Sequence, residues 1–137
     1  MLVKDIMRKK VITINENESI SEVARLMSDN YIGSVVVVLN KKIRGILTER
    51  DILLAMAKQQ GDLRKLLVKD IMTKYVITVS QEANLATTAK LIEENNIKKL
   101  PVIDKNDNIV GIITATDIVI NQHSTIKRLS KQLARQK

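Results

Sequence analysis

The heptapeptide Gly-Ile-Leu-Thr-Glu-Arg-Asp at residues 45–51 returns 66 residues later as Gly-Ile-Ile-Thr-Ala-Thr-Asp at residues 111–117. The repetition covers most of the chain, because Val-Lys-Asp-Ile-Met also occurs twice, at residues 3–7 and 68–72. Two copies at so long a period do not form a solenoid, which needs at least three repeats. The sequence therefore predicts a duplicated subdomain with pseudo-two-fold symmetry and two related clefts between its halves.

The length and composition restrict the kinds of core and ligand that are expected. A chain of 137 residues has the length of one ordinary domain, and each half alone would be marginally stable, so the halves are expected to share a core. The composition is 45% hydrophobic but only 1% aromatic. This scarcity of aromatic side chains argues against nucleic-acid binding by base stacking.

Several functional classes are disfavoured by what the sequence lacks. It has no cysteine, which excludes disulfides and thiolate metal sites, and one histidine, His123, which is expected at an exposed helix end. It also has no apolar run of membrane-spanning length and no signal-peptide pattern. We therefore expect a soluble, cytoplasmic protein without membrane contact.

Hydrophobic periodicity gives both halves the order strand, helix, strand, strand, helix. The predicted strands are residues 11–14, 34–39, 43–47, 76–79, 100–103 and 109–114, with Pro101 suggesting an edge strand or a strand start. The predicted helices begin after Ser19, at Thr48, after Asn84 and at residue 116. The fold class is α+β, with a first repeat at residues 1–60, a second at 61–123 and a basic tail at 124–137. Residues 2–7 and 63–72 are expected to be lead-in segments of their own repeats.

The repeated heptapeptide places chemically useful groups at a strand-to-helix junction. Its glycine is expected to let a ligand approach the backbone, and its threonine places a hydroxyl beside the unpaired N–H groups of a helix start. A helix start favours phosphate, and an aspartate one turn later can bind vicinal hydroxyls such as those of ribose. The alternative interpretation is structural, with Thr48 and Thr114 as helix caps and Asp51 and Asp117 as acids favoured by the helix dipole.

The two copies of Gly-aliphatic-aliphatic-Thr-x-x-Asp, the Val-Ile-Thr strands and the stretch 95–102 resemble a tandem pair of CBS (cystathionine β-synthase type) domains, called a Bateman module. The resemblance covers residues 1–121. It implies two βαββα units, clefts that bind AMP, ADP or ATP and sometimes S-adenosylmethionine, no required cofactor, and association into a homodimer. Carried over residue by residue, it assigns Asp51 and Asp117 to ribose. Thr48 and Thr114 would lie near ribose or phosphate, and the adenine pockets would be lined by Thr13, Ile14, Thr78 and Val79.

The repeats differ at the positions most relevant to phosphate. Arg50 in the first corresponds to Thr116 in the second, and Lys98-Lys99 in the second correspond to residues 33–34 in the first. Only the first motif thus has a cation next to its own aspartate, and Lys98 or Lys99 is a further candidate phosphate ligand. The sequence predicts a tighter, phosphate-rich site at residues 48–51 and a weaker or empty one at residues 114–117.

The tail accounts for most of the net charge of +8, since its five cations leave only +3 on the first 117 residues. Ile126, Leu129 and Leu133 form the apolar face of an amphipathic helix, expected to pack on the module or on a second subunit. Nucleic-acid contact through the cations is the alternative.

The function expected from these features is that of a stand-alone regulatory sensor. It would bind an adenosine nucleotide and signal to a protein partner, without enzymatic activity, because no nucleophile–base pair or metal constellation is evident. The alternative functions are a nucleic-acid-binding adaptor that works through the basic surface and the C-terminal tail, and a ligand-free dimerisation module.

Overall fold

The computed structural model describes residues 1–58 and 62–135, without the side chains of residues 124 and 125. The chain divides into two compact units. Unit 1 takes Met1–Val11, Thr78–Asn106 and the chain from Val110 onward, and unit 2 takes Ile12–Ile77 and Asp107–Ile109. The predicted break at residues 60–62 lies mostly outside the described residues.

Unit 2 is a three-stranded sheet with its helices. Its elements are β1 (Thr13–Ile14), α2 (Ile20–Asp29), β2 (Ser34–Leu39), β3 (Lys42–Thr48), α3 (Glu49–Lys58), a 3₁₀ turn η1 (Leu63–Lys65) and α4 (Val68–Ile71). The sheet order is β1-β2-β3, with β1 parallel and β3 antiparallel to β2.

Unit 1 has the same order of strand, helix, strand, strand, helix, preceded by its short lead-in helix. Its elements are α1 (Val3–Ile6), β4 (Val79–Ser80), α5 (Leu85–Glu94), β5 (Lys99–Ile103), β6 (Ile109–Thr114) and α6 (Ala115–Arg135), and its sheet order is β4-β5-β6. The α+β class and the strand-helix-strand-strand-helix order are therefore confirmed in both halves.

Side-chain caps start the second element of each repeat, as the sequence predicts. The Ser19 hydroxyl accepts a hydrogen bond from the Glu22 N–H at 3.3 Å, and Asn84 Oδ1 accepts one from the Thr87 N–H at 2.7 Å. Each cap pairs one of the N–H groups that the first helical turn leaves open.

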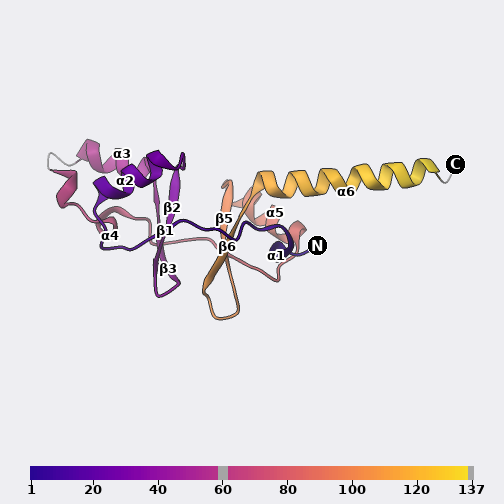
Figure 1. Ribbon diagram of the computed structural model, residues 1–137, viewed down its shortest axis with the longest axis horizontal. Helices are drawn as coiled ribbons and strands as arrows, with labels where there is room; N and C mark the ends of the chain where they lie inside the picture. The colour runs from indigo at the N-terminus through magenta and orange to yellow at the C-terminus, as the bar shows by residue number, and fades with distance from the viewer. Residues whose placement is uncertain (59–61, 136–137) are drawn as a thin grey trace. The chain divides into compact units, whose positions relative to one another are not determined.

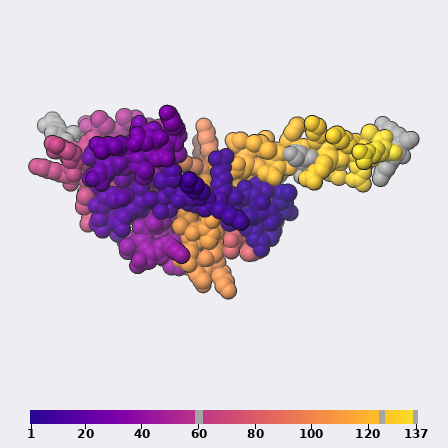
Figure 2. Space-filling view, viewed as in Figure 1, coloured from indigo at the N-terminus to yellow at the C-terminus, as the bar shows by residue number. Residues whose placement is uncertain are grey.

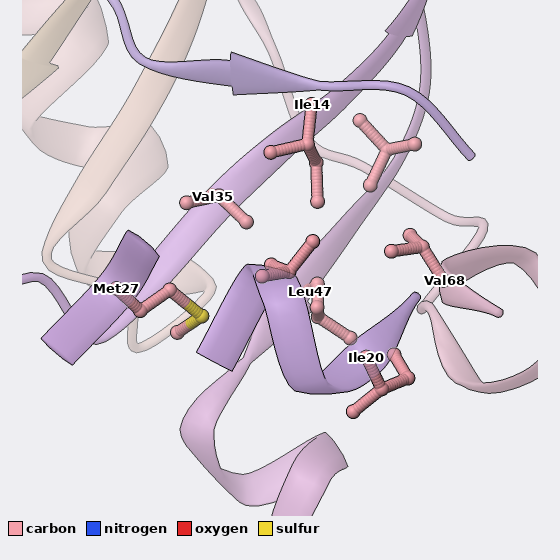
Figure 3. Packing of buried hydrophobic residues seen from close by; sticks show 8 residues of the cluster. Ile14, Ile20, Met27, Val35, Leu47 and Val68 are labelled. Carbon is pink, nitrogen blue, oxygen red and sulfur yellow. The ribbon is translucent and has the colours of Figure 1, made fainter. Parts of the chain in front are cut away.

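The core of unit 2 is aliphatic and includes a residue from far along the sequence. Ile14, Ile20, Val35 and Leu47 are each at most 4% exposed and form one cluster, into which α4 brings Val68 (Figure 3). Val68 is fully buried, and burying such a side chain contributes about 1.5–3 kcal/mol. The segment 63–72 thus completes the core of the first half.

The two lead-in segments are exchanged between the halves. In unit 2, the N–H of Val68 donates to the carbonyl of Glu18 at 2.9 Å, and Thr73 and Ile46 exchange two backbone bonds of 2.9 Å. In unit 1, the N–H of Val3 donates to the carbonyl of Ala83 at 2.8 Å. Arg8 pairs with Ile112 in the same way as Thr73 pairs with Ile46. The sequence repeats 1–60 and 61–123 therefore do not coincide with the compact units.

The motif glycines serve this exchange. A Cβ at Gly45 would lie 2.7 Å from the Thr73 carbonyl oxygen and 2.8 Å from Met72 Sδ. A Cβ at Gly111 would lie 2.7 Å from Met7 Sδ and 2.9 Å from the carbonyl oxygen of Arg8. The expectation that these glycines admit a ligand is therefore corrected, because the space beside them is filled by the lead-in segments.

The first strand of each repeat is shorter than predicted. The β-branched runs at 11–14 and 76–79 predict four-residue strands, but β1 and β4 have two residues each. Val11 and Ile77 instead lie where the chain passes from one compact unit to the other. The strand propensity of these β-branched runs is thus outweighed by the path of the chain between the two units.

Pro101 lies within the central strand of its sheet, not on an edge or at a strand start. The two residues of β4 pair with Val102 and Ile103, beyond the proline. Its missing N–H therefore removes no bond from that short ladder.

The predicted short helix at residue 116 and the separate tail helix are one element. Helix α6 runs continuously from Ala115 to Arg135, so His123 is exposed within a helix instead of at its end. Figure 1 shows α6 running away from the strands of unit 1, and Figure 2 shows its C-terminal part standing clear of the rest of that unit. Among the described residues, no helix combines the length and apolar character needed to cross a membrane.

We expect Gly45→Ala to lower the free energy of unfolding by about 1–3 kcal/mol, because the added methyl overlaps backbone atoms that cannot move away cheaply. Urea denaturation measures the change. Gly33→Ala is the matched control, since its Cβ would lie no closer than 3.4 Å to the flexible Glu49 side chain. Equal stability of the two variants would contradict the assigned role of Gly45.

Candidate functional site

The repeated motif lies at the same junction in each unit. Strand β3 ends at Thr48 where α3 begins, and β6 ends at Thr114 where α6 begins. In both cases the first helical N–H donates to the residue directly before the neighbouring strand, from Glu49 to the Gly33 carbonyl at 2.9 Å and from Ala115 to the Lys98 carbonyl at 2.8 Å. The duplicated sequence therefore gives duplicated backbone geometry.

Within each motif, the threonine and the aspartate cap each other. The Asp51 N–H donates to Thr48 Oγ1 at 3.1 Å, and the Thr48 N–H donates to Asp51 Oδ2 at 3.0 Å. Thr114 and Asp117 form the equivalent bonds at 3.0 and 3.1 Å. The interpretation of Thr48 and Thr114 as helix caps agrees with these bonds. Asp51 and Asp117, expected as acids favoured by the helix dipole, in addition accept an N–H each, through one carboxylate oxygen.

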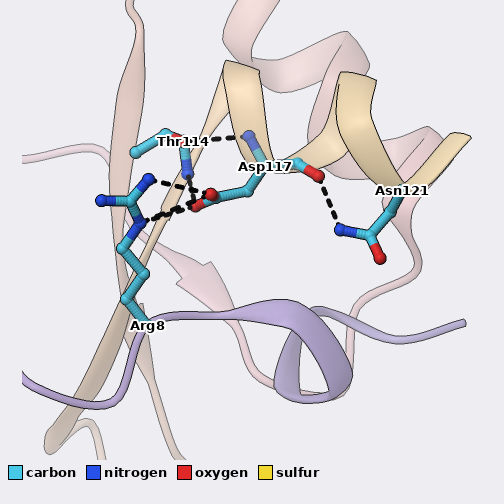
Figure 4. A network of polar contacts seen from close by, with 4 residues as sticks. All are labelled: Arg8, Thr114, Asp117 and Asn121. Carbon is cyan, nitrogen blue, oxygen red and sulfur yellow. Dashed lines mark hydrogen bonds and ion pairs between the residues drawn. The ribbon is translucent and has the colours of Figure 1, made fainter. Parts of the chain in front are cut away.

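The remaining carboxylate oxygen meets a different neighbour in each unit. In unit 2, Thr73 Oγ1 lies 3.4 and 3.5 Å from the two oxygens of Asp51, which is the limit of a hydrogen bond. In unit 1, Arg8 Nη2 lies 3.1 Å from Asp117 Oδ1, and Arg8 Nε lies 3.3–3.4 Å from both oxygens (Figure 4). The Asp117 carboxylate is therefore engaged by a cation, whereas among the described residues the contact of Asp51 beyond its own motif is a distant hydroxyl.

Sequence reasoning missed Arg8 and Thr73. Each directly follows a copy of Val-Lys-Asp-Ile-Met, so their equivalence was visible in the repeat. Their contact with the aspartates was hidden because each lies on the lead-in segment of the other repeat. The two motifs do differ in charge, but the sequence placed the cation at the first motif, through Arg50, whereas the cation that contacts an aspartate is Arg8, which lies outside the motifs and pairs with Asp117.

The ion pair shifts the ionisation of both partners. Partial burial raises the pKa of Asp117, but hydrogen bonds from Arg8 and Thr114 and the charge of Arg8 lower it by more, so its pKa lies below the usual value. The same contact raises the pKa of Arg8. The pair lies near the surface, with 62% of the Arg8 side chain and 14% of the Asp117 side chain exposed.

The four residues expected to line adenine pockets lie at the first strand of each repeat. Ile14 belongs to the hydrophobic core of unit 2 and is 4% exposed, and Val79 is 6% exposed. Thr13 and Thr78 are partly exposed beside them. Both aliphatic side chains are therefore buried instead of lining an open pocket surface.

The candidate phosphate ligands are separated between the units. Arg50 is exposed in the first turn of α3 in unit 2. In unit 1, Lys98 is exposed and Lys99 is half-buried, and burial lowers the pKa of the Lys99 ammonium. The Ala115 N–H donates to the Lys98 carbonyl, so the backbone of this lysine lies next to the Thr114–Asp117 motif.

A further polar group in unit 2 has no assigned partner. Ser34 Oγ is buried and lacks a hydrogen-bond partner within the described residues. Ser34 pairs with Thr48 across β2 and β3, so both side chains point to the same face of the sheet. An unsatisfied buried hydroxyl costs about 1–3 kcal/mol, and a water or a polar ligand group would remove that cost. The sequence showed Ser34 only as a difference from Lys99.

Two hollows lie in other parts of the units. One of about 560 Å³ in unit 2 is lined by Glu16, Arg44, Lys69, Asp70, Met72 and Lys74. One of about 500 Å³ in unit 1 is lined by Met1, Asn84, Leu85, Ala86, Asn121, Gln122 and Ile126. Neither is lined by the motif residues, so the candidate site is defined by its hydrogen-bonding groups. Among the described residues, no group of three His, Asp or Glu side chains is placed to hold a metal ion.

Known proteins similar to this chain contain CBS domains. The family profile named CBS domain matches residues 3–58 and 68–124. The uncharacterized protein MK0525 of Methanopyrus kandleri is 36% identical over 118 residues, which is 85% of this chain and 60% of that protein. The CBS domain-containing protein YhcV of Bacillus subtilis is 34% identical over 122 residues, which is 89% of this chain and 86% of YhcV.

The fold of the chain is also similar to that of a solved CBS domain pair. The CBS domain pair of protein MJ0100, in complex with 5′-methylthioadenosine and S-adenosyl-L-methionine, has a TM-score of 0.76 and 33% identity. The alignment covers 91% of this chain and 98% of that one.

We expect Arg8→Thr to raise the pKa of Asp117 toward its usual value of about 4, because the cation is removed. Since the folded-state pKa is the lower one, the stabilisation by Arg8 is present above pH 4 and is lost as the pH falls through the folded value. NMR titration of the Asp117 carboxyl, with urea melts at pH 7 and pH 3, measures both effects. Lys9→Thr should change neither, and an unchanged Asp117 titration in Arg8→Thr would refute the ion pair.

Proposed function

Because the chain belongs to the CBS domain family, with one copy of the domain in each half, we propose that it is a regulatory module that binds an adenosine nucleotide. The observation that carries this proposal is the repeated Thr–Asp pair, whose aspartate keeps a carboxylate oxygen beyond the one used for capping. The proposal concerns binding and signalling and involves no chemical conversion.

Asp51 is the proposed ribose-binding group of unit 2. Its Oδ2 accepts the Thr48 N–H, while the partner of Oδ1 within the part of the chain that the structure describes is Thr73 at 3.4 Å, so a pair of ribose hydroxyls can donate to this carboxylate. Acidic residues hold ribose in this way in other nucleotide-binding folds. The unpartnered Ser34 hydroxyl, on the same face as Thr48, supplies another polar contact for a ligand.

The adenosine part of the ligand is supported by the structural relative. The MJ0100 domain pair is described in complex with 5′-methylthioadenosine and S-adenosyl-L-methionine, which share an adenosine group. A phosphorylated ligand such as AMP, ADP or ATP is supported by the cations near the motifs, Arg50 in unit 2 and Lys98 and Lys99 in unit 1. Phosphate is also the group that a helix N-terminus favours.

Signalling to a protein partner follows from ligand-linked conformational change. A ligand shifts a module between two states only by its differential affinity for them. We propose that the occupied and empty states differ in the surface presented to the partner.

We also propose that α6 joins two copies of the chain. Val119, Ile126, Leu129 and Leu133 are 52–64% exposed and follow a heptad spacing along α6. Such a narrow stripe is typical of a helix–helix seam. At its base it continues into the 500 Å³ hollow of unit 1 through Gln122 and Ile126.

The charges on α6 favour a second copy as the occupant of this stripe. Lys127, Arg128, Lys131 and Arg135 fall at heptad positions that face away from it, and the flanking Ser130 and Gln132 are uncharged. Two identical helices can therefore meet along the stripe without opposing like charges. Like charges four residues apart, as at 127–131 and 131–135, weaken an isolated helix. Packing of the apolar stripe against a second helix would offset this loss of helix stability.

We expect AMP at 100 times its dissociation constant to stabilise the protein by about 2.7 kcal/mol, raising the melting temperature by roughly 5–10 °C. Thermal shift and calorimetry with AMP, ADP, ATP, GTP and S-adenosylmethionine measure this. Asp51→Asn should weaken AMP binding about tenfold. Asp70→Asn is the matched control, since Asp70 also caps a helix of unit 2, accepting the Leu67 N–H at 2.9 Å. Absence of any adenosine-ligand binding would refute the proposed function.

Ile126→Gln with Leu129→Gln should convert a dimer of the chain into a monomer, because the seam loses two buried apolar side chains. Sedimentation equilibrium measures the mass. Lys127→Gln, on the opposite face, should leave the dimer intact. A dimer that persists in the double variant would contradict the role of α6. A salt-sensitive gel shift with nucleic acid that requires residues 124–137 would instead favour the adaptor function.

A further inference from the structure

The Arg8 side chain is held beside the second motif by the backbone. The Arg8 N–H donates to the Ile112 carbonyl at 2.8 Å, and the Ile112 N–H donates to the Arg8 carbonyl at 2.9 Å. Ile112 precedes Thr114 by two residues in β6. Arg8 therefore starts next to the motif strand, and its guanidinium reaches the Asp117 carboxylate (Figure 4).

Arg8 competes with ribose for the same oxygens. Asp117 Oδ2 accepts the Thr114 N–H at 3.1 Å, and Oδ1 accepts Arg8 Nη2 at 3.1 Å, with Arg8 Nε near both. A ligand that presents only two hydroxyl groups must displace these guanidinium bonds. It offers the released cation nothing in return.

A ligand with a phosphate can replace the Arg8–Asp117 ion pair that it displaces. The Arg8 side chain is 62% exposed, and exposed ion pairs are weak, so the guanidinium can leave Asp117 at small cost. Guanidinium–phosphate bonds are charge-assisted and bidentate. Transfer of Arg8 from Asp117 to the phosphate therefore frees the carboxylate for ribose and forms a new ion pair in one rearrangement.

In unit 2, the neighbour that ribose would have to displace from the motif aspartate is a neutral hydroxyl, not a cation. Thr73 holds the position equivalent to Arg8, pairs with Ile46 through the same two backbone bonds, and lies 3.4–3.5 Å from Asp51. A neutral hydroxyl at that distance does not block ribose, and it gains no charge-assisted bond from a phosphate. The two units thus present the same motif, but only the unit 1 motif, within the described residues, has a cation that a ligand must displace from its aspartate.

We propose that Arg8 is a specificity-determining residue that makes the Thr114–Asp117 site selective for phosphate-bearing adenosine ligands, whereas the Thr48–Asp51 site also accepts uncharged ones. This inference rests on the proposed function. It assigns phosphate selectivity to the motif that the sequence alone predicted to be weaker or empty. The selectivity arises from a residue 109 positions away in the chain.

Calorimetric titration of the full chain with AMP and with adenosine tests the proposal. The Asp51→Asn background weakens the unit 2 site, so the remaining binding reports on Asp117. In this background AMP should bind tenfold or more tightly than adenosine. Adding Arg8→Thr should reduce that ratio about tenfold, and adding Lys9→Thr, a neighbouring cation with the same charge change, should leave it unaltered.

The reciprocal variant gives a second measurement. In an Asp117→Asn background, Thr73→Arg should increase the AMP-to-adenosine ratio of the unit 2 site about tenfold. An unchanged ratio in Arg8→Thr would overturn the role of Arg8 while leaving the proposed function intact. If the unmodified chain binds neither AMP nor adenosine, both the proposed function and this inference fail.

Discussion

The structure depends on a close crossing of two backbone segments at Gly45 and again at Gly111. At both positions the lead-in segment of the other repeat passes so near that a Cβ would lie 2.7–2.9 Å from backbone oxygen and methionine sulfur atoms. This crossing closes the core over Val68 in unit 2 and brings Val3 into unit 1, both fully buried. It also sets Thr73 and Arg8 beside the motif aspartates. Packing and site chemistry therefore share one steric constraint.

Much of the secondary structure was predictable because its signals are local. The strands 34–39 and 109–114 and the caps Ser19 and Asn84 agree with the sequence pattern. The Thr–Asp pairs were predictable too, since three-residue spacing at a helix start gives reciprocal capping. The exchange of lead-ins was not, because the sequence shows that residues 3–7 and 68–72 are equivalent but not which half each contacts. For the same reason Arg8 could not be assigned to Asp117 in advance.

Other differences between the sequence-based predictions and the structure also have specific causes. Gly45 looked like a ligand-approach position because glycine permits any close neighbour, and only the fold identifies that neighbour as Met72 and Thr73. The junction near residue 123 carries no proline or glycine, so α6 continues where a change of composition suggested a boundary. Duplication conserves the backbone geometry of the motif. The two sites diverge instead through single side chains at equivalent positions, Thr73 against Arg8 and Ser34 against Lys99.

The exchanged lead-ins also bear on how such a chain could originate. Before duplication, a polypeptide of one repeat would have carried a lead-in and a glycine-bearing strand that belong to different units. Two molecules would have had to trade their amino-terminal segments for either to be complete. We therefore expect the ancestral form to have been an obligate pair, and the gene fusion to have turned an intermolecular swap into an intramolecular one. On this view, residues 1–60 and 61–137 expressed as separate polypeptides should still recognise each other.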